Sequence, residues 1–183
     1  MAPFLRKTDP HALAVAMTTV KMGDQLVLIG CADGNRMGAI ALKVGLSGRA
    51  VAVVPDEESA VRMKRGAADA GALVDVHMSS LTRLPLDNAG FDLAVVDDTG
   101  GLLTALRPED RVALVRETAR ALKSRGRVIV IGAVPRGGLG ALFTRAQSGP
   151  PFDPQPSLEA DGFRFVRLLG EREGLKFVEG VKA

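Results

Sequence analysis

The sequence has no tryptophan and no tyrosine, so seven phenylalanines are the only aromatic residues among 183. Proteins that bind single-stranded nucleic acid usually stack bases on aromatic side chains, and this composition offers few of them. The formal net charge is +3, from 24 basic and 21 acidic residues, which is too balanced to indicate a polyanionic partner. Nucleic acid is therefore not expected as a partner.

Cysteine and histidine are also scarce. Cys31 is the only cysteine, so no disulfide can form within the chain, and a reducing cytoplasm is the expected location. With His11 and His77 as the only histidines, no zinc-ligand spacing exists, and no metal site is expected. The first residues lack the unbroken apolar core of a secretion signal, and no apolar run is long enough to cross a bilayer. No membrane partner is expected.

What the chain does contain is a regular alternation of apolar strands and amphipathic helices. Strands are predicted at residues 25–29, 49–54, 73–78, 91–96 and 127–131. Helices are predicted at 11–20, 35–44, 55–70, 108–123, 139–147 and 157–160, and a terminal β-hairpin at 163–169 and 175–181. Strands that alternate with helices indicate an α/β fold with a mostly parallel sheet covered on both faces, here with an antiparallel hairpin at its C-terminal end.

No composition shift divides the chain, so a single domain over residues 1–183 is expected. Residues 1–22 would form an N-terminal arm and helix. The segment 135–157 is rich in glycine and proline, and we expect it to be a lid, a loop or a surface that binds a partner.

The turn at residues 30–34, Gly-Cys-Ala-Asp-Gly, joins the first predicted strand to the helix that follows. A glycine turn at a helix N-terminus gathers free backbone N–H groups and the positive end of the helix dipole, which favours a nucleotide-like ligand. The alternative is a turn that only the fold requires, in which Asp33 caps the helix. Cys31 is expected to be a small buried residue rather than a nucleophile.

Carboxylates follow two of the predicted strands. Asp97 and Asp98 come after the strand at 91–96, at the edge where open α/β sheets bind their ligands. They are candidates for a general base or a weak metal site, and the alternative is that they cap backbone N–H groups. Asp56 follows the strand at 49–54, where it would either accept hydrogen bonds from a ligand's hydroxyl groups or cap the next helix.

Four stretches, in this order and spacing, resemble the class I S-adenosylmethionine-dependent methyltransferases of the type 11 sort. They are LIGCADG at 28–34, LTRLPLDNAGFDLAVV at 81–96, ALKSRGRVIVIG at 121–132 and GFRFVRLLGEREGLKFVEGVK at 162–182. The resemblance implies a Rossmann-like, doubly wound sheet of seven strands in the order 3-2-1-4-5-7-6, with strand seven antiparallel. It also implies S-adenosylmethionine as the cofactor and methyl transfer to a small molecule.

The resemblance assigns residues to the cofactor but none to catalysis, for which Asp97 and Asp98 remain the candidates. The residues implied to bind the cofactor are Gly30, Cys31, Ala32, Asp33, Gly34, Val54, Pro55, Asp56, Ser80, Leu81 and Asp97. The expected partners are therefore a small-molecule substrate or another protein, and a homodimer stays open.

The sequence also departs from the family pattern, so its motifs are degenerate. Leu28, Val54 and Ser80 stand where the family has acids, and Ala32 replaces the middle glycine of the turn. A hydrogen bond to a charged group contributes about 1.5–3 kcal/mol, so losing two acids predicts a weakened affinity for the cofactor. This favours a second hypothesis, a catalytically inactive methyltransferase-fold protein that binds or regulates. A dinucleotide-dependent dehydrogenase, the third, would need glycines where Ala32 and Asn35 stand.

Overall fold

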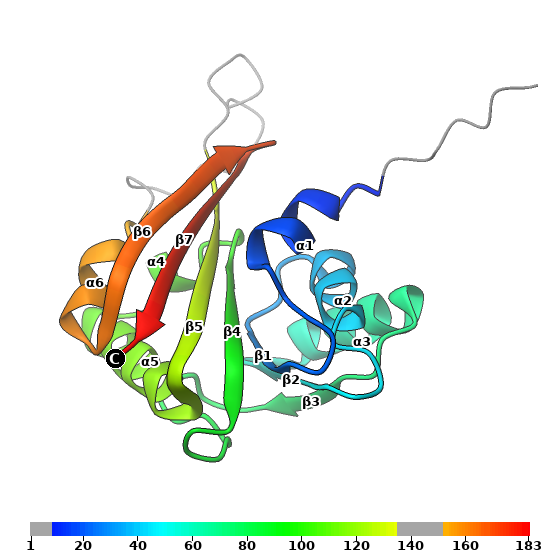
Figure 1. Cartoon of the computed structure of the whole chain (residues 1–183), viewed down its shortest axis with the longest axis horizontal. Helices are drawn as coiled ribbons and strands as arrows, with labels where there is room; N and C mark the ends of the chain where they lie inside the picture. The colour runs from blue at the N-terminus through cyan, green and yellow to red at the C-terminus, as the bar shows by residue number, and fades with distance from the viewer. Residues whose placement is uncertain (1–8, 135–151) are drawn as a thin grey trace, which may run out of the picture.

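The computed structural model describes residues 9–134 and 152–183, and its centre is a seven-stranded sheet (Figure 1). The strands are β1 (Gln25–Ile29), β2 (Arg49–Val54), β3 (Asp75–Met78), β4 (Phe91–Asp98), β5 (Leu122–Ala133), β6 (Phe163–Arg172) and β7 (Leu175–Lys182). Their order is β3-β2-β1-β4-β5-β7-β6. The first five are parallel, and β7 runs antiparallel to both β5 and β6. The predicted α/β fold, strand order and terminal hairpin are confirmed.

Helices cover both faces of the sheet. They are α1 (Ala12–Thr18), α2 (Gly34–Leu42), α3 (Glu57–Ala70), α4 (Leu102–Ala105), α5 (Pro108–Ala121) and α6 (Gln155–Ala160). Helices α1 to α3 lie on one side and α4 to α6 on the other (Figure 1). Successive strand residues point to opposite faces, so Leu26 and Leu28 pack with the first group while Val27 and Ile29 pack with the second. Burial on both faces explains why the central strands are apolar throughout.

Polar side chains and glycines mark several helix ends as the sequence predicts. Asp33 accepts a hydrogen bond from the backbone N–H of Arg36 and caps α2, and Asp56 caps α3 through the N–H of Ser59. Gly71 ends α3 in the left-handed conformation, with φ of 73°. Helix α2 ends at Leu42, two residues before the predicted bound, and Lys43 is its C-cap.

The elements around β4 and β5 differ from the prediction. Asp97 and Asp98 are the last two residues of β4 rather than a following loop, because they pair with Ile131 and Gly132 of β5. Strand β5 begins at Leu122, not at 127, since Leu122 already pairs with Phe91 across a register shift. Helix α5 therefore ends earlier than predicted. Its buried residues are Leu114, Val115, Thr118 and Ala121.

Parts of several predictions lie outside the described residues. The first eight residues of the expected N-terminal arm, the predicted helix at 139–147 and most of the expected lid at 135–157 belong to this group. Helix α4 has only four residues, too few to produce a periodic pattern, and it is not among the predicted helices.

Helices α2 and α3 approach each other backbone to backbone at three glycines. A Cβ atom at Gly66 would lie 2.0 Å from the carbonyl oxygen of Gly34, and one at Gly38 would lie 2.2 Å from that of Gly66. Arg62 of α3 donates from Nε to the carbonyl oxygen of Cys31 at 2.8 Å. The glycines therefore hold α3 close enough to fix the turn between β1 and α2.

Candidate functional site

The turn after β1 is built on a left-handed glycine. Gly30 has φ of 73°, and its N–H donates to the carbonyl oxygen of Val53 at 2.9 Å, which continues the β1–β2 pairing into the turn. Ala32 is exposed and Asp33 is half-buried. The turn therefore stands at the carboxyl edge of the sheet, where the sequence predicts a ligand.

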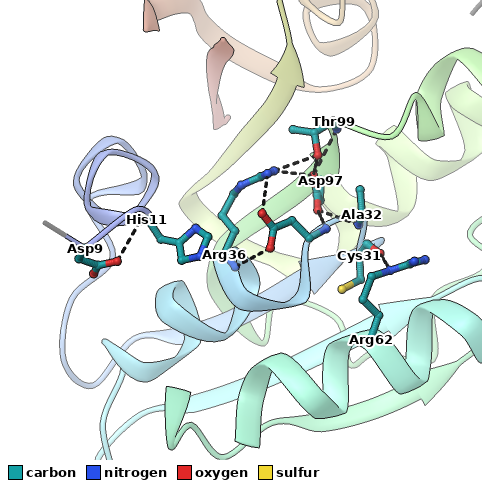
Figure 2. A network of polar contacts seen from close by, with 9 residues as sticks. Asp9, His11, Cys31, Ala32, Arg36, Arg62, Asp97 and Thr99 are labelled. Atoms are coloured by element: carbon teal, nitrogen blue, oxygen red, sulfur yellow. Dashed lines mark hydrogen bonds and ion pairs between the residues drawn. The ribbon is translucent and has the colours of Figure 1, made fainter. Parts of the chain in front are cut away.

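A carboxylate of the chain itself binds the backbone of this turn (Figure 2). Oδ2 of Asp97 accepts from the N–H groups of Ala32 at 2.8 Å and Asp33 at 3.1 Å. Oδ1 accepts from the hydroxyl of Thr99 at 2.6 Å, and Nη1 of Arg36 lies 3.3 Å from it. The Asp97 side chain is fully buried and Arg36 is 11% exposed. Asp97 thus accepts hydrogen bonds from backbone N–H groups of the turn, as the capping alternative predicts. Its carboxylate is therefore not free to act as a base.

The chain after β4 also packs directly on the turn. A Cβ atom at Gly30 would lie 2.7 Å from Cδ2 of Leu102, and one at Gly100 would lie 3.0 Å from Cβ of Ala32. The strand order changes direction between β1 and β4, the point where open α/β sheets usually leave a crevice for a ligand. Here the residues that follow β4 approach the turn closely at Gly30 and Ala32.

The ends of β2 and β3 contribute exposed polar groups to the same edge. Pro55, Asp56 and Ser80 are exposed, and the hydroxyl oxygens of Ser80 and Thr82 are 2.7 Å apart. The hydrogen bond from the backbone N–H of Ser59 holds the pKa of Asp56 below its usual value, so this carboxylate is ionised at neutral pH. Asp56 is therefore an anionic acceptor open to solvent.

The side chains of three apolar residues at or near the predicted cofactor positions point into the hydrophobic core. Leu28 and Val54 have no exposed surface, and Leu81 is 4% exposed. Their side chains pack among other apolar groups and do not reach the edge. The structure therefore brings together Gly30 to Gly34, Pro55, Asp56, Ser80 and Asp97, but not the side chains of Val54 and Leu81.

Cys31 is buried, with 4% exposure, as expected from the sequence. Burial, with a further contribution from Asp97, raises the pKa of its thiol to about 12. The thiolate, which is the nucleophilic form, is therefore negligible at neutral pH.

Asp98 borders a cavity of about 140 Å³ on the other side of β4. Other lining residues come from the β4–α4 loop, α4, the strands β5 to β7 and the segment before α6, and include Thr104, Val130, Phe152, Glu171 and Lys176. Asp98 is 9% exposed, and its Oδ1 accepts from the N–H of Leu103 at 2.7 Å. Adjacent strand residues point in opposite directions, so Asp97 binds the turn while Asp98 lines the cavity.

The sequence did not identify the other cavity residues. Thr104 lies on a four-residue helix, Phe152 follows the segment outside the described residues, and Glu171 and Lys176 sit in the terminal hairpin. No motif links these positions along the chain. Within residues 9–134 and 152–183, no group of three or more His, Cys, Asp or Glu side chains could hold a metal ion.

Burial raises the pKa of Asp98 to about 6, and the neighbouring Asp97 contributes to the shift. In the folded protein the carboxyl of Asp98 keeps a proton that it releases near pH 4 in the unfolded chain. The free energy of unfolding therefore falls as pH rises from about 4 to 6, and it stays at the lower value above pH 6. The shift corresponds to about 3 kcal/mol. We expect Asp98→Asn to stabilise the protein at pH 8 by about 2–3 kcal/mol and to change it much less near pH 4.

Urea unfolding of the wild type and the variant at both pH values measures this difference. Asp87→Asn, at an exposed carboxylate in the loop before β4, is the matched control and should show little change at either pH. An equal effect of Asp98→Asn at both pH values would contradict the raised pKa.

Comparison with known proteins agrees with the fold. A family model described as "Methyltransferase domain" matches residues 27–126, more than half of the chain, so the chain belongs to this methyltransferase family. A search among curated proteins found no match. In the described residues, no helix has the length and apolar character needed to span a membrane.

Solved structures show the same fold at low sequence identity. A SAM-dependent methyltransferase from Aquifex aeolicus is similar with a TM-score of 0.73 and 17% identity, over 95% of this chain and 90% of that one. The PH0226 protein from Pyrococcus horikoshii has a TM-score of 0.69 and 14% identity, over 93% and 87%. A structure of the complex that contains the Haloferax volcanii Trm112 methyltransferase activator has a TM-score of 0.65 and 14% identity, over 93% and 87%.

The chain is therefore a methyltransferase-like protein with the class I fold, and its family implies S-adenosylmethionine as the cofactor.

Proposed function

We propose that this chain transfers a methyl group from S-adenosylmethionine to a small molecule in the cavity beside Asp98. The observation that carries the proposal is the Asp97–Asp98 pair. Asp97 holds the turn where the family binds its cofactor, and Asp98 lines the neighbouring cavity. Two consecutive residues of β4 thus connect the cofactor edge with a space for an acceptor.

The side chains at the cofactor edge fit this group by their chemistry. Asp56 offers an ionised acceptor and Ser80 a hydroxyl, which suit the hydroxyl and amino groups of adenosine. Arg36 lies beside the turn, where its guanidinium is already held by Asp33 and Asp97. When bound, the cofactor supplies an electrophilic methyl group on a positively charged sulfur.

Asp98 suits the role of a base toward the acceptor. A catalytic base works best with a pKa near the working pH, and burial brings the pKa of Asp98 up to about 6. It would take the proton of the acceptor's O–H or N–H as the bond to methyl forms. The bond from methyl to sulfur breaks, and its electron pair stays on sulfur. Proximity and orientation supply most of the remaining rate increase.

Thermal unfolding with S-adenosylhomocysteine tests whether the cofactor edge binds. Ligand at a hundredfold excess over its Kd adds about 2.7 kcal/mol to stability, which for this chain length raises Tm by roughly 5–10 °C. We expect such a rise, and we expect Asp56→Asn to reduce it while Asp87→Asn leaves it unchanged. If millimolar S-adenosylhomocysteine leaves Tm where it is, the proposal fails.

A second candidate is a methyltransferase-fold protein that binds a ligand or a partner without catalysis. It is supported by Asp97, which already takes the N–H groups of Ala32 and Asp33, and by the apolar residues Leu28 and Val54 at two positions where the family has acids. The same unfolding experiment separates the two candidates, because this one predicts no response to S-adenosylhomocysteine. For either candidate we propose a cytoplasmic location, which the single buried thiol of Cys31 supports.

A further inference from the structure

Asp98 is a buried carboxylate whose hydrogen bonding is incomplete. The N–H of Leu103 binds Oδ1 at 2.7 Å, and among the described residues no other donor and no cationic side chain pairs with this group. Burying a carboxylate without a counter-charge is costly, and a donor with positive charge would offset that cost. Asp97 cannot supply it, and its own charge is already paired with Arg36. Within residues 9–134 and 152–183 nothing else offsets this charge, so a cation bound in the cavity that Asp98 lines would be a suitable partner.

Among the described residues, two carboxylates and one ammonium group line the cavity, which leaves an excess of negative charge. Glu171 adds a second carboxylate to the lining, and Lys176 adds an ammonium group. The Lys176 ammonium lies 3.5 Å from the carboxylate of Asp153, which offsets its charge. The guanidinium of Arg111 stacks on the ring of Phe152 at 4.6 Å, and Arg111 is not among the described residues that line the cavity. The carboxylates therefore favour a cation in the cavity.

The size of the cavity and its apolar walls further restrict which ligands would fit. Val130, Val178 and the ring of Phe152 supply apolar surface beside the carboxylates. A cavity of about 150 Å³ can hold benzene, so the 140 Å³ found here fits a molecule of about six non-hydrogen atoms. An aliphatic chain with one ammonium group matches both the walls and the charge.

We infer that this cavity binds a small aliphatic ammonium ion, with its nitrogen at Asp98 and its hydrocarbon part against Val130, Phe152 and Val178. The inference deepens the proposed function and rests on it only for the claim that this ion is the methyl acceptor. Binding itself needs no cofactor, so it is tested without one.

Three probes of similar size separate charge from shape: isoamylamine, isoamyl alcohol and isovalerate. Each is titrated into the full-length protein near neutral pH while amide chemical shifts are followed by NMR. We expect saturable binding of the amine around β4, β5 and β7, at least about tenfold tighter than the alcohol, because a charged hydrogen bond is lost with the alcohol. We expect no saturable binding of isovalerate.

Variants assign the effect to the carboxylate. Asp98→Asn should weaken the binding of the amine about tenfold. It should leave the binding of the alcohol unchanged, since the amide keeps the shape of the side chain. Glu171→Gln should weaken the binding of the amine by a smaller factor. Asp87→Asn should not change the affinity for the amine. Equal binding of amine and isovalerate, or full amine affinity in Asp98→Asn, would overturn the inference. Loss of the response to S-adenosylhomocysteine alone would leave it standing and remove only the acceptor role.

Discussion

Asp97→Ala is expected to lower the free energy of unfolding by about 3–5 kcal/mol, the usual effect of removing one partner of a buried ion pair. The carboxylate is fully buried and accepts from two backbone N–H groups of the turn, from Thr99 and from Arg36. Its removal leaves the Arg36 guanidinium, which is 11% exposed, without this counter-charge. It also leaves the N–H groups of Ala32 and Asp33 without acceptors.

Urea unfolding at neutral pH measures the loss, and Asp56→Ala is the matched control. Asp56 also accepts a backbone N–H, but it is exposed, so its removal should cost only about 1 kcal/mol as a lost helix cap. Domains of this kind are stabilised by about 5–15 kcal/mol in all, so the two results are easily separated. A loss at Asp97 no larger than that at Asp56 would show that the carboxylate does not hold the turn.

Gly66→Ala is expected to destabilise the protein by at least about 3 kcal/mol, although helices generally prefer alanine to glycine. In the interior of an exposed helix this change would gain about 1 kcal/mol. At Gly66 the new Cβ would lie 2.0 Å from the carbonyl oxygen of Gly34, a backbone atom that moves only if α2 and α3 separate. Separation would also pull Arg62 from the carbonyl of Cys31.

Thermal unfolding followed by circular dichroism tests the prediction. Gly90→Ala is the control, because a Cβ there would meet only ordinary contacts at 3.7 Å, and we expect little change. If Gly66→Ala does not accumulate as folded protein, Gly38→Ala, with its contact at 2.2 Å, tests the same packing at a second position. An increase in Tm for either helix variant would contradict the close approach.

The sequence alone determined the parts of this protein that depend on neighbours along the chain. Apolar runs such as 49–54 marked the buried strands, and the caps at Asp33, Asp56 and Gly71 marked helix ends, because a cap binds N–H or C=O groups within a few residues of itself. The family resemblance added the order of the strands, which the structure confirms.

The tertiary structure alone decided what the site residues do. Asp97 and Asp98 are identical in kind and adjacent in sequence, yet one binds a turn more than 60 residues earlier and the other lines a cavity built partly from the terminal hairpin. The same holds for Gly66, whose need to be glycine is set by the backbone of another helix. Long-range contacts leave no periodic trace along the chain, so the division of roles between the two carboxylates had to come from the fold.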